Sequence, residues 1–416
     1  MEKEILHADM NSCFASIEQA RDPSLRNKAM AVCGSTEERN GIVLAKSQEA
    51  KLAGVKTGEV IWQAKQKCPD LIIVRPHYSL YMEYAKKAHD IYLQYTYQVE
   101  PFGMDECWLD VSGTKKLFGG SDKIAEELRQ RFKEELGITL SIGISYNKIF
   151  AKLGSDYKKP DAQTRIDRDN YKEVAWSLPV SDLLFVGRQT TKKFMKYGIL
   201  TIGDLAQADL SFIESLLGIN GRKLWIFANG FDTTPVADYD FQAPIKSIGH
   251  GNTFRRDLVD NNEVYQCLLS LAQDVTRRLI DSNYSAMAVN VDIRGTDLLH
   301  TRAFVNLPYP TQNAAELALY GYKSFLKNWN WKLNIRSLTI RAEKLVVTPK
   351  AVQTELFSDY EHHEKHEKVA QAMHSIKERF GKYSVTYASI HNFELADLDK
   401  GHSVLPANNF VALNSL

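Results

Sequence analysis

Carboxylates at the ends of short apolar segments constrain the fold of this chain more than any other feature of its sequence. Asp9 closes an apolar run over residues 4–9, and Asp105 and Glu106 open a second run over residues 105–111. Apolar runs of this length predict short buried strands. Because neighbouring strand residues point to opposite faces, Asp105 and Glu106 can serve one site only if the backbone bulges or turns there, as residues 101–103 suggest.

Acids gathered on a small antiparallel sheet suit hard divalent cations, which prefer oxygen ligands. Two such cations can clamp the attacking and leaving oxygens of a phosphoryl transfer. The alternative is that these acids are solvated strand ends, as most Asp and Glu side chains are. The surrounding residues therefore decide between a metal site and a plain surface.

The remaining periodicity predicts a chain of several α+β parts. In the first part we expect strands at 29–33, 41–45 and 140–145, and helices at 12–19, 47–52, 81–95, 121–136 and 147–155. Residues 166–231 read as short helices separated by glycines, and the residues after 231 lack periodicity, which predicts a linker. A later part has expected strands at 289–293, 301–305 and 338–347 and helices at 262–281 and 313–326, followed by a tail with one helix at 360–380.

Charge and composition exclude several classes of protein. The 416 residues hold 52 Lys and Arg against 51 Asp and Glu, and the net charge of +1 argues against a generally basic nucleic-acid binder unless charges are segregated onto one face. The five cysteines are odd in number and include no CxxC pair, so we expect neither a disulfide framework nor a structural zinc site. We also expect no membrane span and no signal peptide, and a location in a reducing cytoplasm.

Residues 10–14 read as a turn that enters a helix, where free backbone N–H groups can hold phosphate oxygens. Within this turn Phe14 is either a site residue or a core residue. Gln48 and Lys51 share one face of a later helix. Lys152 and the lysines at 158–159 can neutralise a triphosphate, or they are ordinary surface lysines.

Two glycine turns precede basic residues. Gly187 is followed by Arg188 and Lys192, and Gly221 by Arg222. A glycine lets the backbone approach a phosphate closely, and a helix N-terminus favours an anion, although a solvated charged face is the alternative. Residues 241–349 carry 13 Lys and Arg against 9 Asp and Glu, so a basic strand face there would follow a DNA backbone.

Three sequence motifs in order resemble those of the Y-family translesion DNA polymerases. They occupy residues 7–18 (HADMNSCFASIE), 103–110 (GMDECWLD) and 145–160 (SYNKIFAKLGSDYKKP). The likeness continues into residues 246–250 (KSIGH) and covers residues 1–350. It implies an α+β multidomain fold, a right-hand polymerase with the following parts: palm 1–18 and 77–165, small fingers 19–76, helical thumb 166–231, linker 232–240, α+β little finger 241–349 and C-terminal tail 350–416.

The resemblance also implies roles for single residues. Asp9, Asp105 and Glu106 would hold two Mg²⁺ ions, with the Met10 carbonyl as a further ligand. Phe14 would be the steric gate, an aromatic ring that leaves a ribonucleotide 2′-hydroxyl crowded and unpaired. The implied nucleotide-binding residues are Asn11, Ser12, Cys13, Phe14, Gln48, Lys51 and Lys159. The implied DNA-binding residues are Gly187, Arg188, Lys192, Gly221, Arg222, Lys246, Arg255 and Arg256.

One departure from the family pattern lies on the fingers helix. Many members of the DNA polymerase IV type have a Tyr and an Arg where this chain has Gln48 and Lys51. Lysine lacks the planar bidentate fork of a guanidinium. The string around these two residues looks closer to the catalytic subunit of DNA polymerase V, which leaves the preferred lesion open.

The tail carries two further patterns. Gln353, Leu356 and Phe357 resemble the short peptide by which bacterial polymerases dock on the sliding clamp, with the two apolar side chains as pocket anchors. The alternative is a strand end that packs those side chains into the core. His362 and His366 have the i, i+4 spacing of a metal pair, but the neighbouring Glu and Lys residues predict an exposed helix instead.

Together these features predict template-directed, low-fidelity DNA synthesis across lesions. We expect primer–template DNA, deoxynucleoside triphosphates and the sliding clamp as partners of a monomer. A palm-type nucleotidyl cyclase would use similar acids but would need neither the glycine turns nor the clamp-like peptide. A clamp-tethered DNA-binding scaffold is the non-enzymatic alternative, against which the intact acid trio argues.

Overall fold

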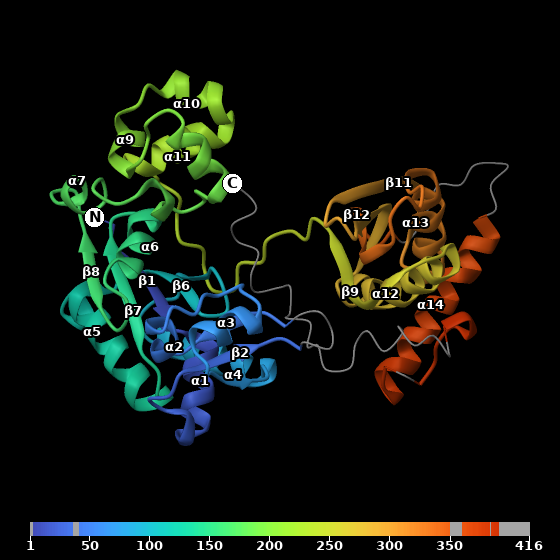
Figure 1. Cartoon of the computed structure of the whole chain (residues 1–416), viewed down its shortest axis with the longest axis horizontal. Helices are drawn as coiled ribbons and strands as arrows, with labels where there is room; N and C mark the ends of the chain where they lie inside the picture. The colour runs from blue at the N-terminus through green and yellow to red at the C-terminus, as the bar shows by residue number, and fades with distance from the viewer. Residues whose placement is uncertain (1–2, 36–40, 350–359, 383, 391–416) are drawn as a thin grey trace. The chain divides into compact units, whose positions relative to one another are not determined.

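The computed structural model describes residues 3–35, 41–349, 360–382 and 384–390, and these fall into two compact units (Figure 1). The first unit comprises residues up to Gly34 and Ile42–Ala243, and the second begins at Pro244. Each unit is described by itself below. None of the described helices combines the length and apolar character that crossing a membrane requires.

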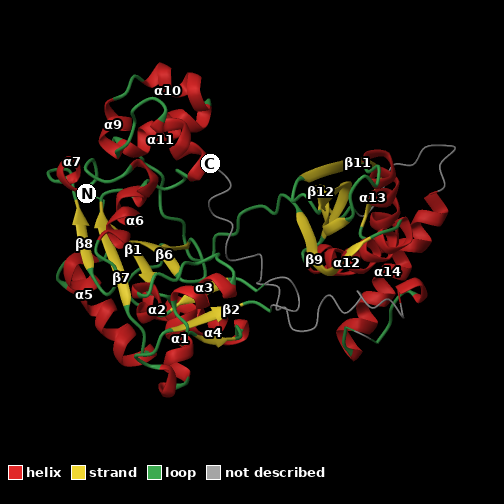
Figure 2. Ribbon diagram, viewed as in Figure 1, coloured by secondary structure: helices red, strands yellow, loops and turns green. Residues whose placement is uncertain are grey.

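The largest sheet of the first unit has five strands in the order β5-β6-β1-β7-β8, of which Figure 2 labels β6, β1, β7 and β8. Its strands are β1 (Ile5–Met10), β5 (Val99–Pro101), β6 (Glu106–Asp110), β7 (Leu140–Ser145) and β8 (Gln163–Ile166). Strand β1 lies antiparallel between β6 and β7, and β8 runs parallel to β7. The sheet therefore places the C-terminal end of β1 next to the start of β6.

The two faces of this sheet have different partners because side chains alternate along each strand. Leu6, Ala8 and Met10 of β1 share a core with α4 (Tyr78–Tyr92) and α5 (Ser121–Arg131). Ile5 points to the opposite face, where it packs with Trp108 of β6 and Ala151 of α6 (Lys148–Tyr157). His7 and Asp9 follow Ile5 at the same period and so lie on the α6 side.

Helix α6 is locally well specified. Its N-cap is Asn147, whose side-chain oxygen accepts a hydrogen bond from the Phe150 backbone N–H at 2.8 Å. Gly143 of β7 lies directly beneath the helix, since a Cβ there would stand 1.8 Å from the Ala151 carbonyl oxygen. The glycine therefore lets helix and strand approach more closely than any larger residue would allow.

Two smaller parts complete the first unit. One is a three-stranded sheet of order β3-β2-β4, with β2 (Met30–Cys33), β3 (Val43–Lys46) and β4 (Ile72–Val74), together with α1 (Cys13–Arg21), α2 (Gln48–Leu52) and α3 (Ile61–Lys67). The other is helical, with α7 (Tyr171–Val174), α8 (Arg188–Met195), α9 (Ile202–Gln207), α10 (Leu210–Leu217) and α11 (Ile219–Ala228) around one core. Most predicted elements of this unit are present.

The residues expected as a linker have no helix or strand, but they do not run free of the palm sheet. Val236 is buried with Ile5 and Trp108, and the backbone N–H of Ala237 donates to a carboxylate oxygen of Glu100 at 2.8 Å. The segment is thus packed on the palm by a side chain whose burial its irregular sequence did not reveal.

The second unit is an antiparallel sheet of order β11-β10-β12-β9 covered by helices on one face (Figures 1 and 2). Its strands are β9 (Ile248–Leu258), β10 (Tyr284–Gly295), β11 (His300–Thr311) and β12 (Ile335–Val347), and its helices α12 (Asn261–Asp281), α13 (Ala314–Asn328) and α14 (Tyr360–Phe380). Strands β10, β11 and β12 are longer than the predicted strands at 289–293, 301–305 and 338–347, and β9 was not predicted. In the first unit, the helix predicted at 121–136 ends at Arg131 as α5, and a π-helical turn follows at Phe132–Leu136.

Candidate active site

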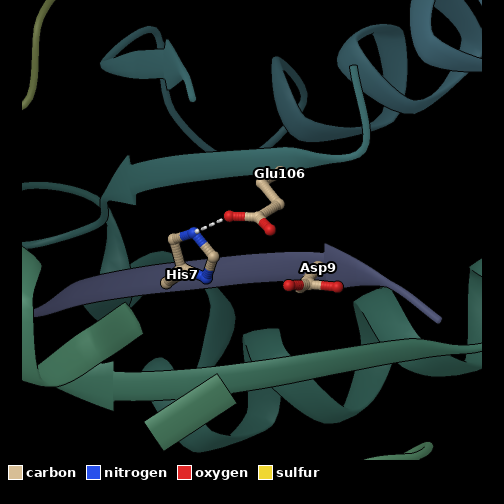
Figure 3. Close-up of side chains that lie close together, drawn as sticks. All are labelled: His7, Asp9 and Glu106. Atoms are coloured by element: carbon tan, nitrogen blue, oxygen red, sulfur yellow. Dashed lines mark ion pairs between the residues drawn. The ribbon is translucent and has the colours of Figure 1, made fainter. Parts of the chain in front are cut away.

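Strand pairing brings two of the predicted acids together. Asp9 of β1 lies directly opposite Glu106 of β6, on the face covered by α6. Figure 3 shows these two side chains with His7, which lies on the same face two residues before Asp9. One ligand atom from each of the three lies within 4.8 Å of the others.

Asp105 reaches the same region by a turn rather than by a strand. The Phe102 backbone N–H donates to the Glu106 carbonyl at 2.9 Å, which closes a tight turn before β6 begins. The Asp105 carbonyl accepts a hydrogen bond from the Met10 N–H at 3.0 Å. Burial, followed by the nearby charge of Glu106, raises the pKa of the Asp105 carboxyl. The turn suggested by residues 101–103 is present, but Asp105 is not among the three residues whose ligand atoms lie within 4.8 Å of one another.

Two lysines of the third motif contact these acids. The Lys152 ammonium lies 3.1 Å from oxygens of both Asp9 and Glu106, and Lys159 pairs with Asp9. Burial raises the pKa of Asp9 to about 7 even though both lysines act in the opposite direction. Burial would also raise the pKa of Glu106, but the hydrogen bond from His7 and the charge of Lys152 outweigh it and hold this pKa well below its usual range.

The donor set fits hard divalent cations. The carboxylates of Asp9 and Glu106 lie on adjacent strands and offer oxygen ligands, which Mg²⁺ prefers. The Glu106 Oε2 atom lies 3.1 Å from the Lys152 ammonium and 3.4 Å from His7 Nε2, so it already faces a positive charge. Lys152 and Lys159 already supply positive charge beside the carboxylates of Asp9 and Glu106. The site therefore suits positive charge.

His7 is a site residue that our sequence analysis missed. Its side chain is fully buried, with Nδ1 2.8 Å from the Ser155 hydroxyl and Nε2 3.4 Å from Glu106. Burial lowers the pKa of His7 to about 4, so the ring is neutral at pH 7. The signal was present in the sequence, because a polar residue two positions before Asp9 on a buried strand must share its face.

The turn after Asp9 offers fewer phosphate-binding groups than predicted. The N–H groups of Met10 and Asn11 already donate to the carbonyls of Asp105 and Thr139, both at 3.0 Å. The Asn11 amide is buried as well, and it bonds Thr139, Ser141 and the Asp161 N–H. Asn11 therefore holds the turn together, and Ser12, Cys13 and Phe14 remain the candidates for a phosphate.

Phe14 is held rigidly at the start of α1. Its ring stacks on Tyr81 of α4 with centroids 4.3 Å apart, and it meets the edge of Tyr78 at 6.0 Å. Tyr81 is fully buried and donates its hydroxyl hydrogen to Glu18. Nearby, the Gln48 amide lies 3.3 Å from the Ser12 hydroxyl, whereas Lys51 is exposed. The predicted nucleotide residues from two segments thus meet at one turn.

Comparison with known proteins agrees with this geometry. The impB/mucB/samB family matches residues 8–156, and the C-terminal domain of that family matches residues 245–356. The chain is 47% identical over 385 residues to the DNA polymerase IV of Acetivibrio thermocellus, a match that covers 92% of this chain and 96% of that protein. It is 36% identical over 385 residues to the DNA polymerase IV of Pelotomaculum thermopropionicum, with 92% and 94% covered. The chain belongs to the DNA polymerase IV family.

The fold agrees with this assignment. A solved Y-family DNA polymerase chimera, Dbh-Dpo4(243-245)-Dbh, superposes with a TM-score of 0.72 at 20% identity, covering 83% of this chain and 99% of that one. The likeness of the three motifs to the Y-family is therefore confirmed. The substitutions Gln48 and Lys51 occur within a chain whose relatives carry the name DNA polymerase IV.

In this member of the DNA polymerase IV family, the two glycines expected to contact DNA in the helical part differ in exposure. Gly187 and the basic residues Arg188 and Lys192 are exposed at the start of α8. Gly221 is instead buried, and a Cβ there would stand 2.3 Å from the Ile213 carbonyl oxygen of α10. Gly221 thus serves helix packing, and its contact with DNA stays a prediction. The next residue, Arg222, is exposed and pairs with Glu214.

The predicted DNA-binding residues of the second unit are exposed but dispersed. Lys246, Arg255 and Arg256 all reach the surface, and Arg256 pairs with Glu263 at the start of α12. The sheet face away from the helices carries further bases that were missed: Arg294, Arg302 and Arg341. Strand alternation was the signal for them, since each lies one position away from a buried core residue.

Proposed function

We propose that this chain copies DNA templates past damaged bases with low fidelity, as a monomer that transfers nucleotides from deoxynucleoside triphosphates to a primer 3′-hydroxyl. The observation that carries the proposal is the convergence of Asp9 and Glu106 from paired strands, with Lys152 and Lys159 against them. Relatives named DNA polymerase IV, matched over nearly their whole length, supply the substrate class.

Asp9, Asp105, Glu106 and the Met10 carbonyl would hold two Mg²⁺ ions. When bound, such ions neutralise the charge that develops on the attacking and leaving oxygens. Until then Lys152 and Lys159 keep the acids balanced and hold their side chains toward one another. We propose that Lys159, the more exposed of the two lysines, turns from Asp9 to the triphosphate when the nucleotide binds.

Phe14 would select the sugar. Its ring is backed by Tyr81, so it cannot yield easily to an extra hydroxyl. A ribonucleotide would then either clash with the ring or leave its 2′-hydroxyl without a hydrogen-bond partner, and each outcome raises the barrier to incorporation.

Low fidelity would follow from the small fingers. Within residues 19–76, the described residues form a three-stranded sheet and short helices. A part of this size encloses the nascent base pair less completely than a large fingers domain, so selection by shape is weak.

Binding to the sliding clamp would add to the affinity of this chain for DNA, which its net charge alone leaves modest. A chain with net charge +1 attracts DNA only modestly as a whole. The clamp-like residues Gln353, Leu356 and Phe357 lie outside the described residues, and their role remains our proposal from the sequence. Deleting residues 353–357 should abolish stimulation of DNA synthesis by the clamp while leaving synthesis without the clamp unchanged.

Primer extension by purified protein with Mg²⁺ tests the proposal on undamaged and damaged templates. Asp105→Asn and Glu106→Gln should each slow nucleotide addition by about 100-fold or more, because a lost ligand removes several kcal/mol of transition-state stabilisation. Asp110→Asn is the matched control, since Asp110 lies on the Glu106 face of the same strand but pairs with Ile5. Wild-type protein that binds primer–template DNA without extending it would refute the proposal, as would full activity in Glu106→Gln.

A further inference from the structure

Histidine and glutamate side chains meet between two helices of the second unit, away from the polymerase site. Glu316 lies in the first turn of α13, and His363, His366 and Glu367 lie on α14. One ligand atom from each of Glu316, His363 and Glu367 falls within 4.8 Å of the others. His366 adds a second imidazole, with Nδ1 3.7 Å from a Glu316 oxygen.

The spacing on α14 places these side chains on one helix face. His366 and Glu367 follow His363 by three and four residues, the separations that bring side chains together along a helix. Sequence spacing alone had pointed to His362 and His366, in a helix expected to be exposed. That expectation is wrong for His363, whose side chain is only 8% exposed and lies against Glu316.

Hydrogen bonds within the cluster and from neighbouring residues hold its side chains in place. The Nδ1 atom of His363 lies 3.0 Å from both Glu316 carboxylate oxygens, and the ring also bonds the Pro310 backbone. Glu367 accepts hydrogen bonds from the Thr311 hydroxyl and from the Gln312 N–H at 3.0 Å. Metal ligands in proteins are held in this way, with imidazole N–H groups on backbone carbonyls and carboxylates on nearby donors.

The charges at this place call for a cation. Two carboxylates, Glu316 and Glu367, lie in one partly buried corner beside His363. Imidazole nitrogens favour Zn²⁺ and related transition metals over Mg²⁺, which prefers oxygen ligands.

We propose that Glu316, His363 and Glu367, with His366 as a fourth ligand, form a binding site for one Zn²⁺-like divalent transition metal that fastens α14 to α13. The site joins residues 47 positions apart in the chain. Because α14 follows the clamp-like residues, the metal would anchor the chain on the C-terminal side of that peptide. Without a metal, His363 contacts Glu316 directly, with Nδ1 3.0 Å from a carboxylate oxygen.

Titration of the full chain with Zn²⁺ separates the two states. The protein is stripped with a chelator, and millimolar Mg²⁺ is kept present so that the active-site carboxylates do not compete for the added metal. We expect one Zn²⁺ per chain, bound at least about tenfold more weakly after Glu316→Gln or His366→Ala. Glu316→Gln keeps a hydrogen-bond acceptor for His363, so α14 can stay docked, which circular dichroism checks.

The matched control is His374→Ala, because His374 also lies on α14 near the acids Asp281 and Glu378. It should bind Zn²⁺ as tightly as the wild type. Binding of Zn²⁺ should also raise the thermal midpoint of the wild type and of His374→Ala, but not that of Glu316→Gln. Equal affinity in Glu316→Gln and wild type, equal loss in His374→Ala, or no Zn²⁺ uptake would overturn the site and leave only the direct contact between His363 and Glu316.

Discussion

Replacing Gly143 of β7 by alanine tests how the sheet positions helix α6, which carries Lys152. In the native backbone a Cβ at residue 143 would lie 1.8 Å from the Ala151 carbonyl oxygen and 2.4 Å from the Ser155 nitrogen, both in α6. Ordinary contact begins at 3.4 Å, so α6 would have to move away from β7 by about 1.5 Å. The neighbours are backbone atoms of a regular helix, so no flexible side chain can absorb the clash.

This displacement should damage both stability and activity. Overpacking of a core costs about 1–3 kcal/mol, and the backbone contacts on this side place Gly143→Ala at the upper end of that range. Lys152 lies on α6, 3.1 Å from Asp9 and from Glu106, so the shift would break both contacts. A misplacement of about 1 Å can lower catalysis by about 100-fold.

Urea unfolding and single-nucleotide primer extension measure the two effects. Gly113→Ala is the control, because a Cβ at that exposed glycine would meet nothing within 4 Å. We expect the control to behave as wild type in both assays. If Gly143→Ala unfolds at the wild-type urea concentration and extends primers at the wild-type rate, the close approach of α6 does not position Lys152, and this reasoning fails.

Three further predictions concern single side chains. Phe14→Val should reduce discrimination against ribonucleotides by about 10- to 100-fold, whereas Phe118→Val should not, and unchanged selectivity would remove Phe14 from the sugar site. Glu100→Gln should lower the free energy of unfolding by about 3–5 kcal/mol, since it strands the buried ammonium of Lys148, 2.6 Å away; a loss below about 1 kcal/mol in urea unfolding would contradict this. Burial lowers the pKa of His89 below its ordinary 6.5, so between those two values the unfolded chain binds more protons and stability falls as the pH is lowered. From pH 7 to 5, His89→Leu should therefore lose less stability than the wild type, and parallel losses in chemical unfolding would argue against it.

The acid site could be predicted because its signals are local in sequence. Asp9 and Glu106 each adjoin a short apolar run, and the turn before Glu106 is visible in its proline and glycine. His7 could have been found by the same period-two argument. The unpredicted features depend on residues far apart in the chain, such as Gly221, whose role is set by the Ile213 carbonyl of another helix.

The burial of His363 was hidden for the same reason. Its neighbours in sequence are charged, and local pattern therefore predicted an exposed helix. Its neighbours in the fold lie far earlier in the chain: Tyr309, Pro310 and Glu316, of which Glu316 is 47 residues away. Local periodicity reports which face of an element is apolar, but a polar group gains a buried place only when a distant partner satisfies it.

The near-zero net charge of this chain conceals a division of charge that the fold creates. At the acid site, Lys152 and Lys159 already balance Asp9 and Glu106, so those two bases add no long-range attraction for DNA. Other bases, among them those at the start of α8 and on strands of the second unit, are exposed, and acids such as Asp292 offset part of the charge on the strands. Electrostatic attraction to DNA acts through such exposed bases and weakens as salt rises. We therefore expect such a polymerase to gain more from tethering than from added charge, because bases placed near the acid site would compete with the metal ions that we propose for its chemistry.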